Sequence, residues 1–141
     1  MAEIFMIGSE EGIKELEADE NPADLFPCMN TQGIHAEARA QLYTLVTRSF
    51  LDDAMQLEPL VRQLSEEGPN IYLLDSSLAS QLAGKDENDI EQLVNQWLEC
   101  EPVEALDLDS EDLIDFLFQL IHFCKTAIQG EDLGVYLYSD G

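Results

Sequence analysis

The sequence predicts an α+β fold: a single compact domain, residues 1–141, in which a small sheet of about three short strands is covered by about five helices. Three observations lead to this prediction. The length of 141 residues is usual for one domain. Short apolar runs occur near both ends and in the middle of the chain, as in buried strands, and apolar residues spaced three and four apart fill longer stretches, as in helices.

The first strand is expected in residues 3–7, EIFMI, an apolar run without helical spacing. Ser9 then supplies a helix N-cap, and the two glutamates after it stand where the helix dipole favours negative charge. We expect this short helix to end near Asp19. The prolines and the final glycine of residues 21–33 predict that this stretch is mostly connection.

The middle of the chain predicts two helical stretches. From Ile34 the apolar residues fall on one helical face, and Arg39 and Arg48 lie off that face. Asp52 and Asp53 start another helical piece, which Pro59 interrupts or restarts because proline fits only the first turn of a helix.

The second half of the chain has the clearest periodicity. Residues 71–74 predict a strand, and Asp75 and two serines offer caps for a helix that runs to Gly84. Residues 87–98 carry apolar side chains at helical spacing, which predicts a helix with one face in the core. Asp109 or Ser110 caps a long, largely buried helix over residues 110–129, and a last strand follows Gly130.

Charge excludes several classes of function. The chain has 30 acidic residues against six lysines and arginines, a formal net charge of −24. Such a molecule repels nucleic-acid backbones and anionic membranes, so neither is an expected direct partner. The imbalance is strongest in residues 86–141, which hold 15 acids and the single base Lys125.

Cysteine usage and the absence of targeting patterns predict a cytoplasmic protein. The three cysteines are odd in number and widely spaced, which fits neither a disulfide framework nor a paired metal site. No secretory leader opens the sequence, and no apolar run approaches the roughly 18 residues that a membrane span needs. We expect neither a metal nor a cofactor.

The candidate partner-binding site is an acidic patch that precedes the long helix 110–129. Acids next to a helix start are explained by its dipole, but most acids here lie too far from it. Such a surplus predicts a non-catalytic interaction protein, for example an inhibitor, an immunity protein or a chaperone, that binds a basic protein partner. The patch comprises Glu99, Glu101, Glu104, Asp107 and Asp109.

The acidity also has two alternative origins. The carboxylates could form a regular ridge that imitates the phosphates of a nucleic acid. Alternatively, the organism could enrich acids in all of its proteins for solubility at high salt. A calcium loop is disfavoured, because Asp112 and Phe118 stand where such a loop requires a glycine and a bidentate acid.

Catalytic patterns are absent from the sequence, which contains no zinc-binding, phosphate-binding or nucleophile-elbow motif. His122 and Cys124 do not form a nucleophile–base pair, because residues two apart on a helix point in different directions. Helical spacing also predicts that aromatics such as Phe116 and Phe118 pack in the core rather than line a ligand pocket. We therefore predict that the protein is not an enzyme.

An alternative site is the polar stripe of the helix 110–129. If its side chains lined a cavity, the domain would bind a small ligand or catalyse a reaction. The stripe consists of Asp115, Gln119, His122 and Thr126.

Two stretches resemble the bacterial YfbM-like family of small uncharacterised proteins. IYLLDSSLASQLA, residues 71–83, resembles the strand and capped helix of that family, and DLIDFLFQLIHFCKTAIQGEDLGVYLY, residues 112–138, resembles its closing helix and terminal strand. This sequence is shorter through the middle and lacks the family's tryptophan-and-histidine segment there. The resemblance implies a bacterial α+β domain of unassigned activity and carries over no functional residues.

Overall fold

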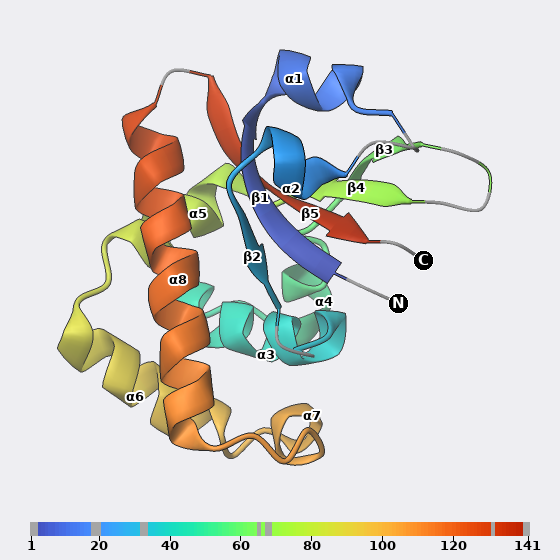
Figure 1. Cartoon of the computed structure of the whole chain (residues 1–141). Helices are drawn as coiled ribbons and strands as arrows, with labels where there is room; N and C mark the ends of the chain where they lie inside the picture. The colour runs from blue at the N-terminus through green and yellow to red at the C-terminus, as the bar shows by residue number, and fades with distance from the viewer. Residues whose placement is uncertain are drawn as a thin grey trace.

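The computed structural model describes residues 3–17, 21–31, 34–64, 66, 69–130 and 132–139. These residues form an antiparallel sheet with the strand order β2-β1-β5-β4-β3, whose main helices gather on one face (Figure 1). The predicted α+β class is confirmed. No helix in the described ranges combines the length and the apolar character needed to cross a membrane.

The strands are β1 (Glu3–Ser9), β2 (Cys28–Asn30), β3 (Leu60–Gln63), β4 (Asn70–Leu73) and β5 (Leu133–Ser139). The longer helices are α3 (Ala36–Thr47), α5 (Ser76–Ala83), α6 (Glu87–Trp97) and α8 (Ser110–Gln129). Shorter helical segments are α1 (Glu10–Glu15), α2 (Pro22–Leu25), α4 (Leu51–Ala54) and α7 (Glu101–Glu104).

The sheet has five strands in the described residues, so the expected number of about three was wrong. In the same residues, the four longer helices and four short helical segments together exceed the expected five helices. The two missed strands lie at the sheet edges. β2 falls in the stretch 21–33 that was expected to be a connection, and β3 falls in the expected helical piece after Asp53. Both are held by pairing with β1 and β4, which local sequence does not encode.

Three predicted helix caps are confirmed, whereas the helix expected to start at Asp52 and Asp53 begins at Leu51 after an N-cap, Phe50, that makes no side-chain cap bond. Ser9, Asp75 and Asp109 each accept a backbone N–H of the following helix. The first helix is shorter than expected, since it ends at Glu15 where Leu16 becomes extended and buries its side chain; the expected end at Asp19 lies outside the described residues.

The core lies on both faces of the sheet because strand residues alternate between them. On one face, α3, α5, α6 and α8 cover a large cluster in which Phe116 of α8 contacts the rings of Phe5 and Trp97. On the other face, α1 contributes to a smaller cluster around Met6 and Tyr136. Phe118, expected in the core, is 44% exposed, since α8 turns it away from the sheet.

Candidate functional site

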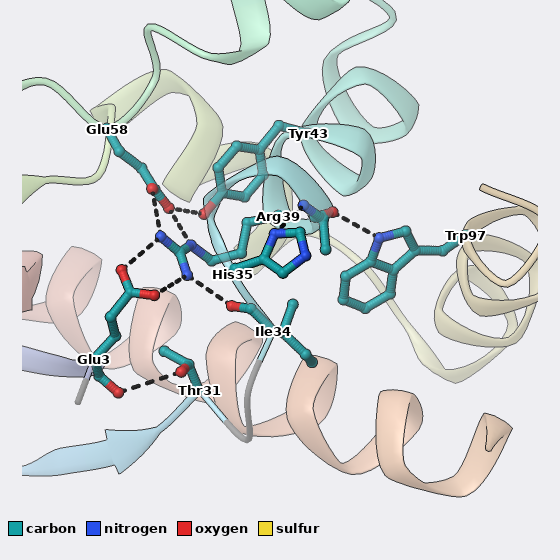
Figure 2. A network of polar contacts seen from close by, with 9 residues as sticks. Glu3, Thr31, Ile34, His35, Arg39, Tyr43, Glu58 and Trp97 are labelled. Carbon is teal, nitrogen blue, oxygen red and sulfur yellow. Dashed lines mark hydrogen bonds and ion pairs between the residues drawn. The ribbon is translucent and has the colours of Figure 1, made fainter. Parts of the chain in front are cut away.

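Among the described residues, the largest buried polar side chain is that of Arg39, which is 1% exposed. Two carboxylates bind it (Figure 2): Glu58 accepts from Nε at 2.9 Å and from Nη2 at 3.1 Å, and Glu3 accepts from Nη1 at 3.4 Å and from Nη2 at 3.2 Å. The carbonyl of Ile34 accepts from Nη1 at 2.7 Å. All five N–H donors of the guanidinium are therefore used.

A second layer of contacts holds this arginine network in place (Figure 2). The hydroxyl of Tyr43 donates to Glu58, and Thr31 donates to the carbonyl of Glu3 at 3.3 Å. The guanidinium also lies over the ring of Phe5, 5.9 Å from its centroid. The network therefore joins β1, the start of α3 and the connection between α4 and β3.

The start of α3 is fixed by two further side chains shown in Figure 2. His35 is the N-cap, and its Nδ1 accepts from the backbone N–H of Ala38 at 3.3 Å. The indole Nε1 of Trp97 donates to the carbonyl of the same alanine at 2.8 Å, which ties α6 to α3. These bonds give His35 and Trp97 structural roles.

The charged and polar groups of the arginine network shift one another's pKa values. Burial by itself lowers the pKa of Arg39, but the charge and hydrogen bond of Glu58, together with Tyr43 and the hydrogen bond to Glu3, outweigh burial and raise the pKa. Burial also raises the pKa of Tyr43 well above its ordinary value, and the negative charge of Glu58 raises it further. Arg39 thus stays cationic and Tyr43 stays protonated at any physiological pH.

The sequence patterns missed this network. Arg39 was placed off the apolar face of α3, and Glu3 and Glu58 lie 36 and 19 residues from it along the chain. With every donor occupied, the guanidinium has no free group for an anionic ligand. We therefore interpret the network as a structural contact that holds these segments together rather than as a binding site.

The acidic patch lies on the segment that leads from the end of α6 through α7 to the start of α8, the end of the molecule farthest from the sheet (Figure 1). Residues 99–115, here called the acidic segment, carry eight carboxylates and no lysine or arginine. All five predicted patch residues are exposed: Glu99, Glu101, Glu104, Asp107 and Asp109.

The carboxylates of the acidic segment are not neutralised within the fold. In the part of the chain that the structure describes, the ion pairs are those of Lys14 with Glu10 and of Arg39 with two glutamates. Asp109 uses one oxygen to cap α8 by accepting from the N–H of Asp112 at 3.0 Å. The remaining charge faces solvent.

The four residues of the polar stripe are all exposed on α8: Asp115, Gln119, His122 and Thr126. Thr126 donates to the backbone carbonyl of His122 at 2.9 Å, and His122 lines a shallow hollow of about 380 Å³ with Phe118 and Lys125. This exposure gives no support to an enclosed ligand site built from the stripe.

The cysteines show no activated thiol. Cys124 is buried in the core, and this burial raises its pKa to about 12. Burial also raises the pKa of Cys28 and Cys100, which are half-buried. A thiolate nucleophile requires the opposite shift.

Two hollows lie on the surface near acidic side chains. One of about 770 Å³ lies at the end of the sheet between α1, α5 and the end of α8, with Glu10, Asp75 and Asp132 among its lining residues. Another, of about 520 Å³, lies between α3, α4 and α7 and includes Glu101 of the acidic segment. Across the described ranges, no three His, Cys, Asp or Glu side chains converge as ligands for a metal ion.

Comparisons with protein-family models, with curated proteins and with solved structures found no match to this chain. Membership of the YfbM-like family therefore stays a prediction from the sequence. Function has to be inferred from the geometry and charge of the molecule itself.

Proposed function

We propose that this protein is a small, non-catalytic, cytoplasmic interaction protein that binds a basic protein partner through its acidic segment. The observation that carries the proposal is the exposure of the five patch carboxylates on a segment without a single cation. Charge of one sign that a fold leaves unpaired and exposed is available to a partner of the opposite sign.

The scaffold beneath the acidic segment is rigid, which favours specific recognition over diffuse attraction. Val103 of α7 is buried, and Leu113 anchors the first turns of α8 in the core. Glu101 and Glu104 are therefore presented from α7, and the other patch carboxylates lie on the short turns that join this helix to α6 and α8. Preformed surfaces lose less conformational entropy on binding than flexible segments do.

Charge neutralisation tests the proposal with variants that keep side-chain shape. In the patch variant, Glu99, Glu101 and Glu104 become Gln, and Asp107 and Asp109 become Asn, which still caps a helix and tolerates the positive φ of 55° at Asp107. The matched control removes the same amount of charge elsewhere by replacing five other exposed acids with Gln: Glu11, Glu15, Glu66, Glu87 and Glu91.

The immobilised protein is exposed to an extract of the cells that make it, at about 0.05 M and about 0.5 M salt, where screening lengths differ several-fold. We expect a basic protein to be retained at low salt by the parent and by the control variant, and to be lost from the patch variant and at high salt. Recovery of no basic protein under either condition contradicts the proposal. Equal weakening by both variants would instead indicate general acidity, as in a salt-adapted protein.

A further inference from the structure

The segment that contains α4 exposes an unusual amount of apolar surface. Phe50 is 83% exposed, Leu51 is 37% exposed and Met55 is 50% exposed. The segment is nevertheless anchored, because Ala54 of α4 is buried and α4 packs against α3. Contiguous apolar side chains on the surface of a folded domain are typical of a docking site.

One of these three side chains, Leu51, borders the hollow of about 520 Å³ beside the acidic segment. Leu51 of α4 lines it together with Cys100 and Glu101, and α3 closes it with Glu37 and Gln41. α4 and α7 both pack against α3, so one helix holds the two walls together. Burial and the charge of Glu99 raise the pKa of Cys100, so this wall presents a neutral thiol.

The charge around the hollow selects the kind of partner. Glu37 and Glu101 stand on its rim, Asp52 and Asp53 are exposed in the first turn of α4, and no lysine or arginine lines it. A second copy of this chain would bring acid against acid at a net charge of −24, and nucleic acid or an anionic membrane is repelled in the same way. An apolar group flanked by cations is the complementary ligand.

We propose that this hollow receives an apolar side chain of the basic partner, so that the ligand is an amphipathic segment in which leucine or phenylalanine alternates with lysine or arginine. The inference rests on the proposed function and extends it, because the acidic segment supplies attraction while Leu51 in the hollow and its exposed chain neighbour Phe50 supply apolar contact. Interfaces commonly combine a small apolar anchor with a charged rim in this way.

Two synthetic peptides test the inference. One is an amphipathic helix of leucine and lysine, and the other has the same lysines with serine in place of leucine. Affinities are measured by titration calorimetry for the parent, for Phe50→Ser/Leu51→Ser and for the control Leu25→Ser/Ile128→Ser, whose side chains are about as exposed but lie on other elements. Unchanged urea midpoints verify that each variant is folded.

We expect the parent and the control to bind the leucine–lysine peptide about tenfold or more tightly than the serine–lysine peptide, and Phe50→Ser/Leu51→Ser to abolish this preference. Bound peptide should also slow the alkylation of Cys100 but not of Cys28. If the patch variant loses binding while Phe50→Ser/Leu51→Ser keeps the preference, the inference is overturned and the proposed function stands. If the patch variant binds as the parent does, the proposed function itself is overturned.

Discussion

The arginine network and the acidic segment use the same kind of side chain in opposite ways. In the network, Glu3 and Glu58 enclose one arginine, and every donor of that arginine is satisfied away from solvent. In the acidic segment, eight carboxylates share no cation and most face solvent. Charge in this protein is thus paired where it is buried, and most of the charge on the exposed acidic segment has no partner within the fold.

The strongest test of this contrast removes the buried cation. Arg39→Ala leaves Glu3 and Glu58 close together without a countercharge, and we expect it to lower the free energy of unfolding by about 3–5 kcal/mol in urea titrations. Lys14→Ala breaks an exposed ion pair with Glu10 and serves as the control, with an expected loss below about 1 kcal/mol. Similar losses in the two variants would show that burial does not distinguish the two kinds of charge.

A second test uses pH. The pKa of Tyr43 is raised in the folded state by burial and by Glu58, so above about pH 10 the unfolded chain loses a proton that the folded chain keeps. The unfolded state then binds fewer protons, and stability falls as pH rises. This fall should amount to at most about 1.4 kcal/mol per pH unit from this one group.

Tyr43→Phe should weaken the loss of stability between about pH 9 and pH 10.5, as measured by urea unfolding at each pH. Cys124, whose burial raises its pKa to about 12, adds a loss of the same sign, so Cys124→Ala is measured in parallel to separate the two groups. If stability falls with pH as steeply in Tyr43→Phe as in the parent, the result would contradict a protonated tyrosine in the network.

The smallest expected effect belongs to the acidic segment. The patch variant should unfold within about 1 kcal/mol of the parent, because surface substitutions without buried partners have little effect on stability. Any change in the free energy of unfolding at low salt should be an increase, because neutralisation relieves repulsion between the carboxylates. This increase should become smaller as added salt screens the repulsion. A loss of several kcal/mol would mean that these carboxylates hold the fold, which would remove the contrast with the network.

Much of the helical structure could be predicted because its signals are local. The N-caps Asp75 and Asp109 and the apolar spacing of α6 act over one or two turns, and the structure confirms them. The short strands β2 and β3 could not be predicted, because each is held at a sheet edge by backbone pairing with a neighbouring strand rather than by a long apolar pattern of its own. Pairing of that kind depends on the whole sheet.

The candidate functional site also has one part that the sequence predicted and other parts that it did not. Composition and spacing were sufficient to predict a concentration of acids in residues 99–109, and the structure shows the five patch residues exposed, while their role as a binding site stays a prediction. The burial of Arg39 depends on two glutamates from remote segments, and the hollow beside Leu51 depends on the packing of α4 and α7 against α3. Neither could be read from periodicity.

The α+β class, the main helices, the caps Asp75 and Asp109 and the negative charge of the C-terminal part were predictable from the sequence, because they follow from neighbouring residues and from composition. The burial of Arg39 with all of its donors occupied, and the hollow that Leu51 shares with the acidic segment, arise from tertiary packing. Burial and pairing depend on which distant segments of the chain fold against one another, and local sequence patterns do not specify those contacts.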